Sequence, residues 1–211
     1  MRLITCVAIA SGAALFAVPA AAHAPNLVEN GDFDASLAGW FEAGPLILES
    51  WSDAFDVEGS PTSGSVRQEN LNDDGIKAGG IGQCVPITAG ESYRFGGSTY
   101  KPSGQSAAGR AGILFHWKSS TDCTGPDVGG YFGTDGSAAD FDEWYPFTSD
   151  FRVAPAGAHT AQLDLVSRKD DATGTFVAYW DGLFVVPEPA TMLLQSAALG
   201  ALVALARRRR C

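Results

Sequence analysis

Across the middle of the chain, short segments in which apolar and polar residues alternate are separated by residues that favour turns. Alternation with a period of two is typical of β-strands buried on one side, and no stretch has the 3.6-residue period of an amphipathic helix. Turn signals fall at Gly59-Ser60-Pro61, Ala89-Gly90-Glu91, Pro102-Ser103-Gly104 and Pro155-Ala156-Gly157. The pattern predicts an all-β domain.

The expected strands are antiparallel and too many for one sheet. They are Leu46–Trp51, Gly80–Ile87, Ser92–Tyr100, Ala111–Lys118, Tyr145–Val153, His159–Val166 and Thr175–Val186, with a short additional strand at Ser65–Gln68. Without helices to cover them, such strands bury their apolar faces most simply by packing as two sheets. We therefore expect a two-sheet sandwich, most simply a jelly roll.

The first 22 residues have the features of a secretory signal peptide. A short positive start is followed by an apolar run from Leu3 to Val18 and by small residues at cleavage spacing. We expect cleavage after Ala22, because a cut after Ala24 would place Pro25 at the new N-terminus. A retained signal anchor is the alternative, although the apolar run is short for a membrane span.

Residues 186–211 predict a membrane segment at the other end. Pro187-Glu188-Pro189 precedes an apolar run over residues 190–206, which Arg207, Arg208, Arg209 and Arg210 follow. This length is near the lower limit for one transmembrane helix. Because positive residues stay in the cytoplasm, the chain before Pro187 is expected outside the inner membrane. The prolines should hold the tripeptide extended and accessible.

This end resembles the PEP-CTERM sorting signal of Gram-negative bacteria. The resemblance rests on Pro187-Glu188-Pro189-Ala190-Thr191, the apolar run and the arginine cluster, in that order at the chain end. It implies processing by an exosortase, a membrane cysteine transpeptidase, with delivery to the cell surface or an exopolysaccharide matrix. An ordinary C-terminal anchor is the alternative.

The two ends leave residues 23–185 as one exported domain, long enough for a real core. Residues 23–186 contain nine Lys and Arg against 23 Asp and Glu, a net charge of about −14. Such a surface repels nucleic acid, which we exclude as a partner. It fits a soluble extracellular protein, a protein that binds divalent cations, or simply a well-solvated acidic surface.

Of the four cysteines, Cys6 lies in the leader and Cys211 in the tail, which leaves Cys84 and Cys123 in the exported domain. Two cysteines in an oxidising compartment predict a disulfide. Its closed loop would stabilise the domain by about 3 to 4 kcal/mol. Metal ligation is the alternative, but neither cysteine has a neighbouring Cys or His at ligand spacing.

Several segments of the domain resemble galactose-binding-like jelly rolls, which include many carbohydrate-binding modules. They are Asn26-Leu27-Val28-Glu29-Asn30-Gly31-Asp32-Phe33-Asp34 with Gly39-Trp40, the segment containing Gln83, Val85, Ile87, Gly90 and Tyr93, and Trp180-Asp181-Gly182-Leu183-Phe184. The resemblance implies that the opening and closing strands lie together and hold a structural Ca²⁺.

By position in that family, the carboxylates of Asp34 and Asp181 and the backbone carbonyl of Asp32 would be calcium ligands, which suits a cation that prefers oxygen. This chain has Asp34 where the family usually has Glu, and Gly182 where a second Asp often stands. The alternative is that Asp32 and Asp34 serve a turn and that Asp181 faces solvent or caps a loop.

A carbohydrate site needs aromatic rings that stack on the C–H faces of sugars, with polar groups near them. The candidates are Trp51, Tyr100, Trp117, Tyr131 and Trp144. For each of them the alternative is a place in the core. Trp40 and Trp180 lie in segments that pair strands and are expected in the core.

Signals for catalysis are weak. His116 and His159 lie in no nucleophile or metal motif. The carboxylates of Asp140, Asp142 and Glu143 beside Trp144 could form a glycosidase pair, but glycosidases usually need a larger cleft, and a solvated loop explains the cluster.

We therefore expect a non-enzymatic protein of the cell surface or exopolysaccharide matrix. Signal peptidase and exosortase would process it, and it would pass through the inner membrane before release. A carbohydrate-binding module with a defined polysaccharide ligand is the first alternative, and a small glycan hydrolase is the second.

Overall fold

A computed structural model of the chain describes residues 24–44, 47–60, 62–72, 77–135 and 142–188. The regular elements in these ranges are strands. In chain order they are β1 Phe41–Glu42, β2 Ile47–Ser52, β3 Ser65–Asn70, β4 Lys77–Pro86, β5 Ser92–Tyr100, β6 Gly109–Lys118, β7 Asp127–Asp135, β8 Trp144–Thr148, β9 Arg152–Val153, β10 Thr160–Lys169 and β11 Phe176–Pro187.

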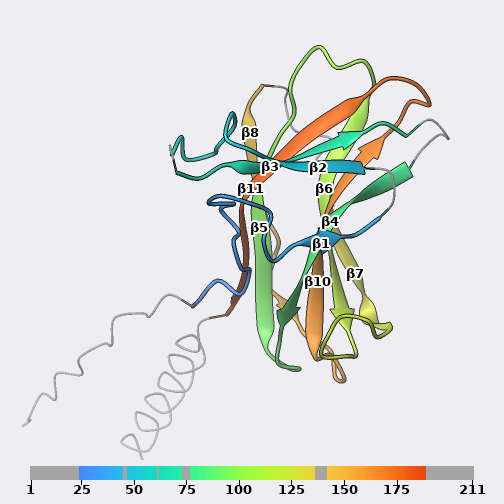
Figure 1. Ribbon diagram of the computed structural model, residues 1–211. Helices are drawn as coiled ribbons and strands as arrows, with labels where there is room; N and C mark the ends of the chain where they lie inside the picture. Colours follow the sequence, from blue (N-terminus) through green and yellow to red (C-terminus); the bar gives the residue numbers. More distant parts are fainter. Residues whose placement is uncertain (1–23, 45–46, 61, 73–76, 136–141, 189–211) are drawn as a thin grey trace, which may run out of the picture.

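The strands form two antiparallel sheets that pack face to face as two layers (Figure 1). The five-stranded sheet has the order β1-β4-β10-β6-β7, and the six-stranded sheet has the order β2-β3-β11-β5-β8, with β9 paired to β5. Successive strands from β3 to β6, and again from β9 to β11, alternate between the two sheets. The expected jelly-roll sandwich is confirmed.

The core fills the space between the sheets. Phe95 of β5 stacks on Phe115 of β6 with ring centroids 4.7 Å apart, and Trp117 meets Phe115 edge-on at 4.8 Å. Trp180 of β11 is completely buried, as expected, whereas Trp40 packs against the core and is only partly buried. Burial of each large apolar side chain contributes about 1.5 to 3 kcal/mol, so this layer supplies most of the favourable free energy of folding.

Every predicted strand is present, but the structure adds two and divides one. Alternation does not predict β7 because Gly129, Gly130 and Gly133 interrupt it, yet this segment pairs with β6. The two residues of β1 are too few for a pattern and are held by pairing with β4. The strand expected over Tyr145–Val153 is divided into β8 and β9, which both pair with β5.

The segment that opens the domain lies along its last strand, as the family resemblance implies (Figure 1). The amide of Leu27 donates to the carbonyl of Val185 at 2.8 Å, and the amide of Leu183 donates to the carbonyl of Gly31 at 3.0 Å. The side chain of Asn26 bonds the backbone of both Leu183 and Val185. Hydrogen bonds therefore tie the opening segment to the closing strand, which also pairs with β3 and β5.

The predicted sorting tripeptide begins inside β11, so the domain boundary expected at residue 185 falls within a strand. Pro187 lies opposite Tyr93, and the amide of Glu188 donates to the carbonyl of Ser92 at 2.8 Å. The segment is extended as expected, but its first two residues are paired with β5 rather than free. Pro189 lies outside the described residues.

The other features of the ends lie outside the described residues too. They are the signal peptide, the apolar run over residues 190–206, and the arginines Arg207, Arg208, Arg209 and Arg210. In the part of the chain that the structure describes, no helix is long and apolar enough to cross a membrane.

Candidate functional site

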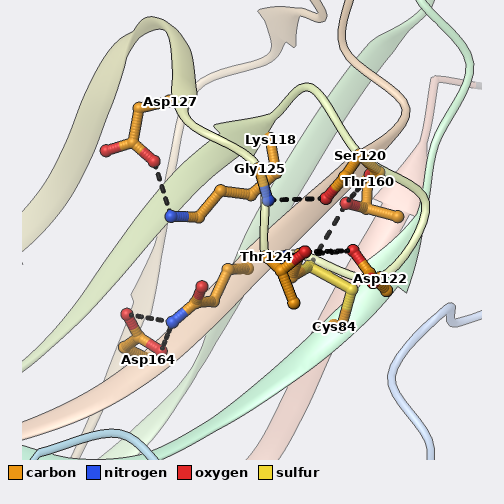
Figure 2. The surroundings of a disulfide bond; sticks show 11 residues. Cys84, Lys118, Ser120, Asp122, Thr124, Gly125, Asp127, Thr160 and Asp164 are labelled. Carbon is orange, nitrogen blue, oxygen red and sulfur yellow. Dashed lines mark hydrogen bonds and ion pairs between the residues drawn. A yellow bond between two sulfur atoms is a disulfide. The ribbon is translucent and has the colours of Figure 1, made fainter.

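Cys84 and Cys123 form the expected disulfide, with Cα atoms 5.8 Å apart. It ties β4 to the loop that joins β6 and β7, over residues 119–126 (Figure 2). Hydrogen bonds close the same loop, because the amide of Ser119 donates to the carbonyl of Pro126 at 3.1 Å and the hydroxyl of Thr160 donates to the carbonyl of Ser120 at 2.7 Å. The crosslink thus fixes a loop against the outer face of the five-stranded sheet.

Lys118 and Asp127 stand at the two ends of this loop. The ammonium of Lys118 lies 2.7 Å from Oδ1 of Asp127. Figure 2 shows the two side chains directed toward each other. Nδ1 of His116 lies 3.2 Å from the other oxygen of the same carboxylate. The Lys118 ammonium, acting first through its hydrogen bond, lowers the pKa of the Asp127 carboxyl, and His116 acts in the same direction. Asp127 therefore stays ionised.

A second carboxylate, Asp164 of β10, lies next to this cluster and is 8 % exposed. The amide of Gln162 donates to both of its oxygens, at 2.8 and 3.1 Å. Nε2 of His116 lies 3.6 Å from the same carboxylate, so the imidazole is placed between two acids. Burial raises the pKa of Asp164, and the Gln162 amide and the charges of His116 and Lys118 act in the opposite direction.

One glycine makes room for this carboxylate. A Cβ at Gly82 of β4 would lie only 2.3 Å from Oδ1 of Asp164 and 3.1 Å from the ring of Phe41. Strand register places Phe41, Gly82 and Asp164 in one line across β1, β4 and β10, and Leu114 of β6 continues it. An aromatic ring that is 41 % exposed therefore lies beside a polar group on the same face.

The same face is hollowed next to Leu114. A pocket of about 290 Å³ opens there. Its lining combines the apolar side chains of Leu114 and Val166 with the side chains of Arg110 and Arg168, over Ala111, Gly112 and Gly133. Across the sheet from β1, the outer face of the five-stranded sheet therefore carries the ring of Phe41, the polar cluster of Gln162, Asp164 and His116, and the apolar pocket beside Leu114. We call this surface the groove face.

The structure places four of the five predicted aromatic candidates, Trp51, Tyr100, Trp117 and Trp144, away from this face. Trp117 is wrong as a stacking residue because it is 1 % exposed and packs between Phe115 and Tyr93. Trp51 packs against the core, and its indole N–H donates to the carbonyl of Phe33 at 2.6 Å. The backbone of Tyr131 lies opposite His116 in the groove face, but its side chain is not described.

Tyr100 and Trp144 are brought together on the other sheet. They lie opposite each other in β5 and β8, with ring centroids 5.6 Å apart. Tyr179 lies opposite Tyr100 in β11, and Phe55 from the loop after β2 packs on both tyrosines at 4.8 and 4.5 Å. The rings of Tyr100 and Tyr179 therefore pack against Phe55 and hold its loop on the outer face of the six-stranded sheet.

The predicted calcium ligands are only partly gathered. Asp181 is 2 % exposed, and its two carboxylate oxygens accept hydrogen bonds from the amides of Val57 and Gly182, at 2.9 and 2.7 Å. Burial, together with the charges of Asp56 and Asp32, raises the pKa of Asp181 to about 7. Asp32 and Asp34 both lie on the segment that opens the domain, and both are exposed.

No three His, Cys, Asp or Glu side chains are grouped to hold a metal ion anywhere in the described ranges. Both oxygens of Asp181 are already engaged by amides, so a calcium ion would have to share them. The calcium site at Asp32, Asp34 and Asp181 stays a prediction, which a stability measurement can test.

Reasoning from sequence did not find the groove face, although part of the signal was present. The parity of β6 marks Arg110, Leu114, His116 and Lys118 as one face and Trp117 as the opposite, buried face. Parity assigns each side chain to one face of its strand, but it does not show which residues of other strands lie beside it. Asp164 and Phe41 join the face only through strand register.

Comparison with solved structures shows the same fold in carbohydrate-binding proteins. A family 16 carbohydrate-binding module superposes with a TM-score of 0.51 at 18% identity, over 76% of this chain and 99% of that one. The C-terminal family 22 carbohydrate-binding module of Clostridium thermocellum Xyn10B gives 0.51 at 17% identity, over 74% of this chain and 90% of that one.

The fold also occurs inside a larger protein. The enzymatically active domain of bacteriophage CBA120 tailspike protein 4 matches with a TM-score of 0.57 at 12% identity, and the match covers 77% of this chain but only 21% of that one. At these identities the likeness extends to the fold alone. No protein-family model matches the chain, and no curated protein matches its sequence.

Proposed function

We propose that the protein is an exported, non-enzymatic carbohydrate-binding protein whose groove face holds a polysaccharide of the cell surface or surrounding matrix. The observation that carries the proposal is the line of Phe41, Asp164 and Leu114 across three strands, beside an apolar pocket. The shared fold of carbohydrate-binding modules supports it.

The chemistry of the groove face suits a sugar chain. A sugar ring has an apolar C–H face and polar edges, so its recognition needs apolar surface next to fixed hydrogen-bonding groups. Phe41 and Leu114 offer apolar surface, whereas Gln162, Asp164 and His116 offer an amide, a carboxylate and an imidazole that hold each other in place. Groups fixed before the ligand arrives lose little entropy on binding.

The ends of the chain supply the delivery part of the proposal. The leader exports the domain, and the Pro187-Glu188-Pro189 tail holds it at the inner membrane until an exosortase removes the tail. The disulfide between Cys84 and Cys123 agrees with an oxidising compartment. Binding to the matrix would then retain the released domain at the cell surface.

A hydrolytic role has less support. Asp142 accepts hydrogen bonds from the amide of Ser103 at 2.8 Å and from the hydroxyl of Tyr100 at 3.5 Å, which explains its position as part of a turn. Asp142 and Glu143 lie next to the aromatic cluster of the six-stranded sheet, away from the pocket of the groove face.

Affinity electrophoresis tests the proposal. The full chain, exported so that its disulfide forms and kept in mild detergent, is run through gels that contain soluble polysaccharides, including exopolysaccharide from the native host. We expect retardation that Phe41→Ala and Gln162→Ala each reduce, because each removes a contact from the groove face. Trp144→Ala, on the opposite sheet, is the matched control and should bind normally.

Each outcome has a meaning. If Trp144→Ala loses binding while Phe41→Ala keeps it, the ligand site lies on the aromatic cluster. If no polysaccharide retards the protein, the domain serves the matrix as a structural protein without a glycan ligand. Glycan hydrolysis that disappears in Asp142→Asn would show that the protein is an enzyme.

A further inference from the structure

Two exposed apolar side chains lie on the outer face of the six-stranded sheet. Val153 of β9 is 63 % exposed, more than any other large apolar side chain in the described ranges, and Phe151 is 37 % exposed. β9 pairs with β5 so that Val153 lies opposite Ser92, the neighbour of Tyr93. Tyr93 is buried in the core, and adjacent residues of a strand point to opposite faces, so Val153 points outward.

The neighbours of these two side chains are apolar and basic. The guanidinium carbon of Arg94 in β5 lies 5.2 Å from the ring centre of Phe151 and 6.0 Å from that of Phe184 in β11. Strand register places Val186, which is half-buried, opposite Arg94. Contiguous exposed apolar side chains mark interaction surfaces more often than isolated ones do. We call this surface the end patch; it consists of Arg94, Phe151, Val153, Phe184 and Val186.

The end patch lies beside the residue that precedes the predicted membrane segment. The amide of Glu188 donates to the carbonyl of Ser92, and Ser92 lies opposite Val153 on its other side. Two strand spacings of about 4.8 Å therefore put Val153 roughly 10 Å from Glu188. A chain advances at most about 3.6 Å per residue, so the apolar run over residues 190–206 begins within about 7 Å of Glu188.

We infer that the end patch rests on the lipid surface of the inner membrane while the tail is in place. The inference rests on the delivery part of the proposed function, in which residues 190–206 cross the membrane. If that run begins in the bilayer, Glu188 lies at the bilayer surface, and Val153 lies close enough to reach it. The domain is then seated on the lipid in one orientation rather than tethered loosely above it.

The side chains of the end patch suit this partner. Exposed Phe and Val side chains can bury about 5 to 10 Å deep at the boundary between headgroups and acyl chains. An arginine beside them covers apolar surface with its stem and keeps its charge among the headgroups, and Arg94 already lies over two aromatic rings.

The charge of the domain makes this contact depend on the tail. A net charge of about −14 over residues 23–186 repels anionic lipid at long range, and the end patch offers few apolar side chains. The tail overcomes this because it holds the end patch next to the bilayer at a high effective concentration. Removal of the tail should therefore release the domain as well as its anchor.

Spin labels at two positions test the contact. The full chain, with Cys6 and Cys211 replaced by serine, is placed in lipid nanodiscs of phosphatidylethanolamine and phosphatidylglycerol. A nitroxide is attached through Val153→Cys in one protein and through Leu48→Cys in the control. Leu48 is 57 % exposed on the same sheet, but its row of paired residues crosses β11 at Val177, far from Glu188.

The measurement is the rate at which each label collides with a nickel chelate, which stays in water, and with oxygen, which concentrates in the bilayer. We expect collisions with nickel to be several-fold less frequent at Val153 than at Leu48, and collisions with oxygen to be more frequent. The same proteins in detergent give the reference.

A charge placed in the end patch should lift it from the lipid. Phe151→Asp should return the label at Val153 to the nickel access of the control position, because a carboxylate resists burial among acyl chains. Leu71→Asp is the matched variant, since Leu71 is 46 % exposed just after β3, and it should leave the label protected. Circular dichroism and thermal melting check that both variants are folded.

The outcomes separate the inference from the proposed function. Equal nickel access at Val153 and Leu48 in a chain that elutes with the nanodiscs overturns the inference while the membrane anchor stands. Protection from nickel without a gain in oxygen collisions shows that protein covers the end patch and overturns it too. A chain that does not elute with nanodiscs overturns the predicted anchor and the inference together.

Discussion

Asp181 should make the domain lose stability as the pH rises. Its carboxyl is 2 % exposed and lies near Asp32 and Asp56, and burial raises its pKa to about 7 from the ordinary 3.8. Between pH 3.8 and about pH 7, Asp181 keeps its proton in the folded protein, whereas in the unfolded chain it has lost the proton. The free energy of unfolding therefore falls as the pH rises through this window and stays low above it.

The size of the fall follows from the shift. Roughly three pKa units at about 1.4 kcal/mol each amount to about 4 kcal/mol. Asp181→Asn removes the titrating group, so its stability should lack this fall. Asparagine offers one acceptor oxygen where two amides, those of Val57 and Gly182, now donate, which costs about 1 to 3 kcal/mol at all pH values. The variant should therefore be less stable than the wild type at pH 4 and at least as stable at pH 8.

Urea unfolding monitored by tryptophan fluorescence measures this difference. Wild type, Asp181→Asn and the control Asp53→Asn, which alters an exposed carboxyl in the loop after β2, are compared from pH 4 to pH 8 with a chelator present. Subtracting the variant from the wild type cancels the other titrating groups. Curves that run parallel for wild type and Asp181→Asn would refute the reasoning, because Asp181 would then carry no raised pKa.

The same unfolding experiment tests the predicted calcium site. If the ion binds at Asp32, Asp34 and Asp181, calcium in place of chelator should raise wild-type stability at pH 8, by about 2.7 kcal/mol at a hundredfold excess over the dissociation constant. Asp181→Asn should not respond. If the wild type shows no shift either, the calcium prediction is wrong.

Two further predictions concern the crosslink and the chain end. Replacing Cys84 and Cys123 together by alanine should lower the free energy of unfolding by about 4 kcal/mol, from the entropy of the loop that spans 39 positions, and a loss below about 1 kcal/mol in guanidinium unfolding would contradict this account. Inserting four Gly and Ser residues between Val186 and Pro187 should speed tail removal several-fold in a pulse-chase experiment, because the tripeptide would no longer pair with β5. Equal rates would show that release of the strand end does not limit processing, and no removal in either protein would count against exosortase processing itself.

Local pattern was enough for much of the fold. Period-two alternation predicts a strand over Ser92–Tyr100 with the bounds that β5 has, although the structure buries both faces of β5 from Phe95 to Thr99. Alternation does not predict β7, because its glycines leave no pattern of apolar and polar residues. This segment is a strand because it pairs with β6. Alternation also marks Trp117 as core through its parity with Phe115, a signal that the choice of stacking candidates did not use.

The sequence by itself determined the all-β class, most strand positions and the pairing of Cys84 with Cys123, because each depends on local pattern or on counting. Only the tertiary structure decided the groove face. Phe41, Asp164 and Leu114 come from three strands that are distant in the chain, and they meet because register aligns them across β1, β4, β10 and β6. Parity assigns a side chain to a face, but its neighbours on that face are set by which strands pair and in what register, and those depend on the packing of the whole sandwich.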